Sequence, residues 1–314
     1  MGQKTKIQWT EATWNPIRGC SRVSEGCRFC YAEVMAARFA GPGQPYEGLA
    51  SRTPSGPRWT GDVQLVEKHI FDPLHWKRPQ RVFVNSMSDL FHEQLDDEQI
   101  ALIFAVMAAA RRHMFQVLTK RPERMSLWFT EAGPAATQEA WTENRIDLGN
   151  MRWPGWPLPN VWLGVSVEDP ATAMMRIPLL LETPAVVRFV SAEPLLEPID
   201  LRAVIMGNGD TLGTALFNHG IGTGLDWVII GGESGPSARP CDVAWIRSIV
   251  LQCKYAGTAC FVKQLGSNPV EANPDATFEF DFGCLRDSHG GDWSEWPGYL
   301  RVREMPDATT PEGS

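Results

Sequence analysis

Three cysteines in one short stretch are the residues of this chain best suited to bind a metal. Cys20, Cys27 and Cys30 lie within eleven residues, spaced C-x6-C-x2-C, and Phe29 directly precedes the third. Thiolates are soft ligands that suit iron–sulfur clusters and zinc. A structural zinc site usually has four protein ligands, whereas a catalytic site keeps one position open. Because no His or Cys follows Cys30 before His69, the sequence favours an open site with three thiolates, or zinc completed by a distant residue.

Polar residues at the ends of predicted strands form a second pattern. Short β-branched runs alternate with helical patterns, which predicts an α/β fold with a parallel sheet and right-handed crossovers. We therefore expect a partial or complete (β/α) barrel, whose active site lies at the carboxyl ends of its strands. These ends read Asn85-Ser86-Met87-Ser88-Asp89, Thr119-Lys120-Arg121, Ser166-Val167-Glu168-Asp169, Ser191-Ala192-Glu193-Pro194, Gly231-Gly232-Glu233-Ser234 and Lys263-Gln264. As a set they indicate a polar site, although Asp89 and Asp169 taken singly are equally typical of helix N-caps.

The predicted elements and domains follow from the same patterns. Strands are expected over 81–85, 115–119, 161–166, 186–191, 227–230 and 260–264, and helices over 31–39, 96–112, 170–181 and 243–255, with a short helix opened by Pro122. Residues 41–62 and 207–224 predict loops, and 131–159, rich in Gly, Pro and Trp, predicts an insertion. We expect a barrel over 1–266 and a C-terminal extension over 267–314, which forms a small cap or strand pair.

The residues around the three cysteines resemble a known superfamily. Radical S-adenosylmethionine enzymes hold a [4Fe-4S] cluster with the pattern C-x3-C-x-aromatic-C in a loop after the first barrel strand. Cys27-Arg28-Phe29-Cys30 reproduces the second half, while the first gap here has six residues. The stretches Ile7-Gln8-Trp9-Thr10, Trp14-Asn15-Pro16 and Cys30-Tyr31-Ala32-Glu33 more specifically resemble a phage-associated family, labelled phage gp-thirty-seven/gp-sixty-eight proteins and distantly similar to spore photoproduct lyase. This resemblance runs over about residues 5–267.

The resemblance implies a cofactor and a set of binding residues. Cys20, Cys27 and Cys30 would hold the cluster, and S-adenosylmethionine would chelate its fourth iron and yield a 5′-deoxyadenosyl radical that abstracts hydrogen from substrate. By placement, Asn85, Ser86 and Asp89 face the methionyl end, and Ser166, Ser191 and Glu193 face the ribose or substrate. The remaining candidates for cofactor binding are Phe29, Tyr31, Gly231, Gly232 and Glu233.

The sequence leaves alternatives open for the segment Gly231-Gly232-Glu233 and for the candidate catalytic residues. The superfamily places a Gly-Gly-Glu segment after the second strand, whereas Gly231-Gly232-Glu233 follows a late strand, so its role does not transfer by position. Its glycines either let the backbone approach a ligand or form a tight turn. The candidate catalytic residues are Lys263 and Cys241, and Cys241 is either a hydrogen donor or a small buried hydrophobe. Cys253 and Cys260 are expected in the core.

The proposed substrate follows from the resemblance alone. We expect a radical rearrangement (isomerisation) of a hypermodified thymine side chain in phage DNA, with a repair lyase that splits a DNA photoproduct as the alternative. A third hypothesis is a zinc-stabilised nucleic-acid-binding module without catalysis. The expected partners are DNA or a nucleotide-derived substrate and a one-electron donor such as flavodoxin or ferredoxin.

The net charge of the chain limits the ways in which it could bind nucleic acid. The formal net charge is −8, which argues against a basic surface that coats duplex DNA but leaves a local basic groove open. One dense basic stretch contains Arg111, Arg112, His113, Lys120, Arg121 and Arg124, and is either a pair of solvated helix ends or a phosphate-binding patch.

Cysteine usage and hydropathy indicate the compartment. Seven cysteines with three clustered do not read as a disulfide framework, so a reducing compartment fits. No apolar run of eighteen residues or signal peptide is visible, which predicts a soluble, cytoplasmic protein with no membrane partner, in the host cytoplasm if phage-encoded. Among thirteen tryptophans, Trp153, Trp156, Trp293 and Trp296 lie in loop-like contexts, where they either stack on bases or pack beneath loops.

Overall fold

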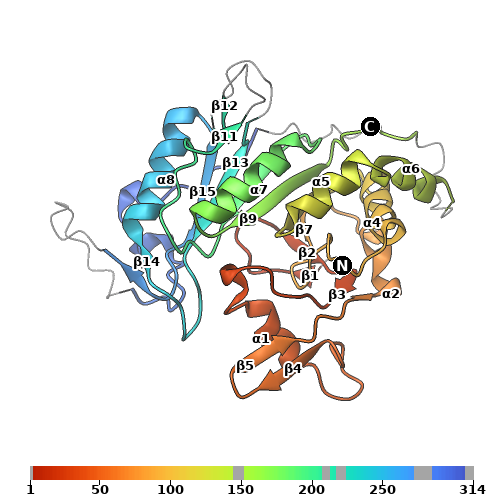
Figure 1. Cartoon of the computed structure of the whole chain (residues 1–314), viewed down its shortest axis with the longest axis horizontal. Helices are drawn as coiled ribbons and strands as arrows, with labels where there is room; N and C mark the ends of the chain where they lie inside the picture. Colours follow the sequence, from red (N-terminus) through yellow and green to blue (C-terminus); the bar gives the residue numbers. More distant parts are fainter. Residues whose placement is uncertain (1–2, 144–151, 207–212, 217–223, 272–284, 308–314) are drawn as a thin grey trace. The chain divides into compact units, whose positions relative to one another are not determined.

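A computed structural model describes residues 3–143, 152–206, 213–216, 224–271 and 285–307 of the chain (Figure 1). The chain forms two compact units. The first comprises Met1–Gly164, Thr183–Val186 and Ala308–Ser314, and the second comprises Val165–Glu182 and Val187–Asp307.

The first unit is built on parallel strands. β2 (Ala12–Trp14) pairs with β7 (Arg81–Val84), and β7 pairs with β8 (Met114–Thr119), each in parallel register. The short β1 (Gln3–Lys4) lies antiparallel to β2 at the edge, and β9 (Val161–Val167) follows β8 in the strand order. All of β7 except its first residue is buried, as expected for a sheet covered on both faces.

Helices complete the first unit. α4 (Asp97–Ala109) is almost entirely apolar after its first turn, and it begins at a capping box in which Asp96 and Gln99 exchange hydrogen bonds. α5 (Pro122–Thr130) starts at Pro122, whose fixed φ suits the first helical turn. α2 (Glu67–Ile70) and α3 (Asp72–His75) are single turns. α6 (Gly133–Glu143) packs against α4 and lies in the predicted insertion, where no helix was expected.

A small substructure interrupts the strand–helix alternation after β2. β3 (Ile17–Arg18) pairs with β6 (Gln64–Leu65), and the chain between them contains the 3-10 turn η1 (Glu25–Cys27), α1 (Tyr31–Arg38) and a hairpin. The prediction that 41–62 is loop throughout is wrong, because β4 (Ala50–Thr53) and β5 (Gly56–Trp59) form an antiparallel hairpin beside α1 (Figure 1). Its turn carries Pro54-Ser55-Gly56, which hid the strands among loop-forming residues.

The second unit continues the alternation. The strand order runs from β9 through β10 (Arg188–Ala192) and β13 (Trp227–Gly231) to β15 (Ala259–Gln264), and β13 is parallel to both of its neighbours. α7 (Pro170–Glu182) joins β9 to β10, and α8 (Val243–Ala256) precedes β15. The short strands form two further pairs, β11 (Ile205–Met206) with β12 (Gly213–Thr214) and β14 (Cys241–Asp242) with β16 (Pro269–Val270).

The C-terminal extension covers the outer edge of β15. Val262 N donates to Val302 O at 2.8 Å, and Glu304 N donates to Cys260 O at 2.8 Å. Two 3-10 turns, η3 (Trp293–Glu295) and η4 (Gly298–Leu300), precede this segment. Residues 278–282, an aromatic run in the sequence, and Cys284 lie outside the described residues.

The loop tryptophans mostly pack against other aromatic rings. Trp156 contacts Phe104 and Phe129 at centroid distances of 5.8 and 5.3 Å, and Trp153 lies 6.1 Å from Trp156. In the second unit, the guanidinium of Arg303 lies over the rings of Trp293 and Trp296 at 4.9 and 5.4 Å. These contacts favour the packing interpretation for Trp153, Trp156 and the buried Trp296, whereas Trp293 is 45% exposed.

The architecture is mixed α/β with a parallel sheet, and it is compatible with the predicted partial (β/α) barrel. Five of the six strands predicted in the sequence lie within one residue of their observed bounds, and the sixth, predicted over 186–191, runs from Arg188 to Ala192. Within the described residues, no helix is long and apolar enough to cross a bilayer.

Candidate functional site

The loop that carries the three cysteines follows the first parallel strand. Cys20 lies just after β3, Cys27 ends η1 and Cys30 is the residue before α1. All three are half-buried free thiols. Gly19 positions the start of the loop, since its φ is +88° and a Cβ there would lie 2.1 Å from Asp62 O. The sequence thus places three thiols on one short loop at the carboxyl end of β2.

Burial dominates the acid–base behaviour of two of the thiols. Burial is the largest cause that raises the pKa of Cys20, Asp89 adds to the increase, Arg121 opposes it and the charges of Cys30 and Cys27 add smaller increases, so that the pKa is about 12. Burial also raises the pKa of Cys30, against backbone hydrogen bonds at the start of α1 that lower it. Cys20 and Cys30 are therefore neutral thiols at pH 7 in the metal-free chain. A metal that binds them must displace protons.

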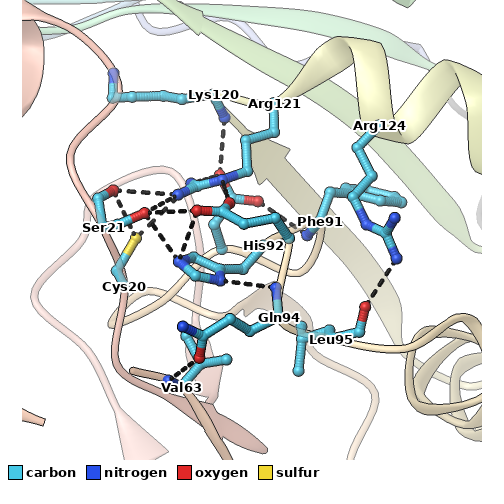
Figure 2. A network of polar contacts seen from close by, with 12 residues as sticks. Cys20, Ser21, Val63, Phe91, His92, Gln94, Leu95, Lys120, Arg121 and Arg124 are labelled. Atoms are coloured by element: carbon cyan, nitrogen blue, oxygen red, sulfur yellow. Dashed lines mark hydrogen bonds and ion pairs between the residues drawn. The ribbon is translucent and has the colours of Figure 1, made fainter. Parts of the chain in front are cut away.

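Arg121 is the centre of the polar network beside Cys20 (Figure 2). Its Nη2 donates to Ser21 O at 3.2 Å and to Ser21 Oγ at 2.7 Å, while its Nη1 lies 3.9 Å from Cys20 Sγ. The same side chain forms ion pairs with Asp89 at 3.2 Å and with Glu93 at 2.8 Å. His92 Nε2 lies 2.9 Å from Ser21 Oγ. This network ties the end of β8 to the cysteine loop.

Asp89 joins the ends of two neighbouring strands. It follows β7, and its carboxylate accepts hydrogen bonds from Thr119 Oγ1 at 2.7 Å and Lys120 N at 3.0 Å, at the end of β8. It also accepts from Phe91 N at 3.0 Å. The side chain is buried. Asp89 is therefore a hub between strand ends, and the N-cap interpretation does not describe it.

Asn85 and Ser86 lie beside the residue that follows Cys30. Tyr31 OH donates to Ser86 O, and Asn15 Oδ1 accepts from Ser86 Oγ at 3.1 Å. Asn85 has φ +60° and is 2% exposed. Neither polar atom of its side chain has a hydrogen-bond partner within the described part of the chain. Because a buried unpaired amide is costly, Asn85 has the character of a group held for a ligand.

Glu33 is a site residue that sequence reasoning missed. It lies in α1, is 2% exposed and pairs with Arg22, which belongs to the loop between Cys20 and Cys27. Its carboxylate also accepts from Trp59 N at 3.2 Å, and Arg22 Nη2 donates to Arg28 O at 2.7 Å. Glu33 therefore anchors the cysteine loop to α1 and to the hairpin. In the sequence, Glu33 is a single acidic residue in the first turn of a helix, where acidic residues are common because they interact favourably with the helix dipole. Its sequence position therefore does not distinguish it from an ordinary surface residue.

The second unit carries its own polar group at the strand ends. Glu193, after β10, forms an ion pair with Lys263 and accepts from Gln264 Nε2 at 3.1 Å, both from the end of β15. Ser166 Oγ donates to Glu193 O at 3.2 Å. Glu193 and Lys263 are 19% and 22% exposed in their side chains. A carboxylate and an ammonium that reach solvent can both contact a polar ligand.

The Gly231-Gly232-Glu233 segment is explained largely by packing. A Cβ at Gly232 would lie 2.2 Å from Leu265 O, so the backbones of neighbouring segments approach too closely for any other residue. A Cβ at Gly231 would lie 3.1 Å from the carboxyl carbon of Glu193. Glu233 is buried and forms a bidentate pair with Arg239. This segment therefore shapes the surroundings of Glu193.

Several other predicted residues have roles in packing or helix capping. Cys241 lies in β14 and is 1% exposed, and burial raises its pKa to about 12, as for a small buried hydrophobe. Cys253 and Cys260 are buried, as expected. Asp169 accepts from Thr172 N at 2.7 Å in the first turn of α7, so its N-cap interpretation holds. Ser191 is buried in β10.

The dense basic stretch divides into different environments. Arg121 is 8% exposed and His113 is 1% exposed, so neither is a solvated helix end. Burial lowers the pKa of His113, and its Nε2 lies 3.1 Å from Pro73 O. Arg124 instead pairs with Asp97 near the surface. The interpretation of the whole stretch as solvated helix ends is therefore wrong for Arg121 and His113.

The fold and these side chains define an α/β protein with a three-cysteine loop at the carboxyl end of a parallel strand. The chain belongs to the family described as "Protein of unknown function (DUF5131)", whose model matches residues 4–294. That match includes the cysteine loop and every strand end described above. A search of curated proteins found no match, and a search of solved structures found none either.

Proposed function

We propose that this chain is a radical S-adenosylmethionine enzyme whose [4Fe-4S] cluster is held by Cys20, Cys27 and Cys30. The observation that carries the proposal is the gathering of three free, half-buried thiols on one loop after the first parallel strand. When bound, the cluster and S-adenosylmethionine supply one-electron cleavage of the cofactor and hydrogen abstraction from substrate. The resemblance noted in the sequence supports the same assignment.

The donor set fits such a cluster. Within the described residues, no group of three or more His, Cys, Asp or Glu side chains is arranged around a single ion. A cubane cluster does not require that arrangement, because each thiolate ligates a different iron atom. Three cysteines leave one iron for a cofactor, and the unpaired amide of the buried Asn85 lies at the end of β7.

The chain's own residues would hold the loop and the cofactor. Arg121 fixes Ser21 through its carbonyl and hydroxyl oxygens, and so fixes the backbone beside Cys20. Glu33 restrains the segment between the first two cysteines through Arg22. Asn85 offers both an amide donor and an amide acceptor to the amino and carboxylate groups of a bound amino acid. These are orienting roles, which is how proteins assist cofactor chemistry.

The second unit carries its own polar pair, Glu193 and Lys263, which is suited to contact a polar ligand. The ammonium of Lys263 donates to Glu193, which fixes both side chains at the ends of β10 and β15, the two strands that flank β13. Lys263 can hold a proton close to a substrate atom, and Glu193 can accept a hydrogen bond from a ribose or substrate hydroxyl. We propose the side chain of a hypermodified thymine in DNA as substrate, and isomerisation as the reaction, on the resemblance alone.

Cofactor cleavage tests this proposal. The protein reconstituted anaerobically with iron and sulfide is incubated with dithionite and S-adenosylmethionine, and 5′-deoxyadenosine is measured by chromatography. We expect cleavage by the unaltered chain and by the buried control Cys253→Ala, and a loss of about a hundredfold or more in Cys30→Ala, because removal of a cluster ligand abolishes cluster function. Stoichiometric zinc with no cleavage would instead favour the nucleic-acid-binding module.

A further inference from the structure

Exposed apolar side chains gather on and beside the cysteine loop. Six of the thirteen large apolar side chains that are exposed in the described residues lie between positions 23 and 39. They are Val23, Phe29, Tyr31, Val34, Met35 and Phe39. We call this set the α1 patch. Single exposed apolar residues are normal, whereas a concentration of this kind marks an interaction site.

The geometry of α1 explains why these side chains cannot be buried by the helix's own unit. Residues 31, 34, 35 and 39 recur at helical spacing, so they share one face of α1 and its end. The opposite face is occupied by Ala32, Glu33, Ala36 and Ala37, all buried, and α1 packs on the β4–β5 hairpin (Figure 1). The small residues face the unit and the large ones face solvent, which inverts the usual arrangement of a surface helix.

Charge is concentrated in the same segment. Residues 17–60 contain six arginines, no lysine and three glutamates, which gives this segment a formal charge of +3. Because the whole chain carries a formal charge of −8, the remaining residues together carry −11. The six are Arg18, Arg22, Arg28, Arg38, Arg52 and Arg58. An acidic partner is therefore attracted to this segment and repelled by the rest of the chain, which orients its approach. A second copy of this chain would present the same positive segment, so charge disfavours self-association through it.

The composition of the patch matches a protein interface better than a nucleic-acid surface. Protein interfaces have an apolar core with Met, aromatic residues and Arg enriched and Lys depleted. Nucleic-acid binding depends instead on basic side chains that are available to phosphates. Here Arg22 and Arg58 are already paired with the buried Glu33, and Arg52 Nε donates to Ala37 O at 3.4 Å. Three of the six arginines of this segment thus already have partners within the chain.

We propose that the α1 patch docks an acidic one-electron carrier protein, which delivers the electron that the cluster requires. This inference rests on the proposed function. Phe29 lies between Cys27 and Cys30, and Val23 lies between Cys20 and Cys27, so the docked surface and the cluster ligands share one loop. One electron leaves the reduced carrier and enters the cluster; the carrier is oxidised by one electron and the cluster is reduced by one, without transfer of atoms.

Charge insertion into the patch tests the proposal. The probe is flavodoxin, an acidic carrier, and its binding to the chain is measured by calorimetry. The double substitution Met35→Glu and Phe39→Glu alters two exposed side chains. Neither residue is a proposed cluster ligand or the sequence neighbour of one. We expect the dissociation constant to rise by about tenfold or more, as for the loss of interface anchors. Leu127→Glu, at a residue of α5 that is 52% exposed, is the matched control and should leave binding unchanged.

Cofactor cleavage separates docking from chemistry. Flavodoxin-supported cleavage should fall in the double variant in parallel with binding, while dithionite-supported cleavage stays at the unaltered level. Equal binding by the variant and the unaltered chain, or no binding of flavodoxin or ferredoxin by the unaltered chain, would overturn the proposal. So would a variant that loses affinity for duplex DNA but keeps flavodoxin binding. Absence of dithionite-supported cleavage in the unaltered chain would refute the proposed function instead, whatever the binding result.

Discussion

Replacing Arg121 with alanine is expected to lower the free energy of unfolding by about 3–5 kcal/mol. The reason is that Asp89 would remain as a buried carboxylate without its cationic partner, and Asp89 is 5% exposed. The substitution also removes both hydrogen bonds to Ser21 next to Cys20. Urea denaturation followed by circular dichroism measures the loss of stability, and the rate of alkylation of Cys20 measures the loosening of the loop.

Arg124 supplies the control for Arg121. It lies three residues further along the chain and pairs with Asp97, but the two side chains are 30% and 45% exposed. An exposed pair contributes about 0–1 kcal/mol, so Arg124→Ala should change stability little and leave Cys20 alkylation unchanged. Similar losses in the two variants would show that burial of the Arg121 network is not what stabilises the loop.

Replacing Glu33 with alanine is expected to lower the free energy of unfolding by about 1.5–3 kcal/mol, the range for hydrogen bonds to charged groups. The substitution removes the buried acceptor of Arg22 and of Trp59 N. Arg22 can reach solvent, which limits the penalty. Because Arg22 lies in the cysteine loop, we also expect Cys27 to react faster with a thiol reagent, as followed by mass spectrometry of alkylated peptides.

Glu47→Ala is the matched control for Glu33. Glu47 is exposed and its carboxylate accepts one hydrogen bond, from Gly43 N at 2.7 Å. It lies in the same substructure, but within the described residues no hydrogen bond joins its side chain to the cysteine loop. Its replacement should leave both stability and Cys27 reactivity close to their unaltered values. Unchanged Cys27 reactivity in Glu33→Ala would refute the anchoring role of Glu33.

The strands and their polar ends could be predicted because they depend on local patterns. Strand β8 is a short, mostly apolar run between His113 and Lys120, interrupted by Gln116, and this local pattern locates it. Parallel strands end at one edge of a sheet, so residues after β7 and after β8 were expected to meet. The observed pair of Asp89 with Arg121 joins those two strand ends.

The partners of individual side chains could not be predicted. Arg121 lies in a basic stretch that reads as solvated, and only the fold shows that Asp89 and Ser21, 32 and 100 positions away, surround it. The partner of Glu33 could not be predicted either, because Arg22 lies 11 residues earlier in the chain, in the loop before α1. Helix α6 was missed because it opens with Gly133-Pro134, which local rules assign to a turn.

Iron and sulfide content tests the central claim most directly. The chain is purified anaerobically and reconstituted, and metals are measured together with absorbance near 400 nm, beside the triple variant Cys20→Ala, Cys27→Ala, Cys30→Ala and the control Cys253→Ala. We expect about four irons and four sulfides per chain in the unaltered protein and the control, and essentially none in the triple variant. Bound zinc without iron, or iron that the triple variant retains, would contradict it.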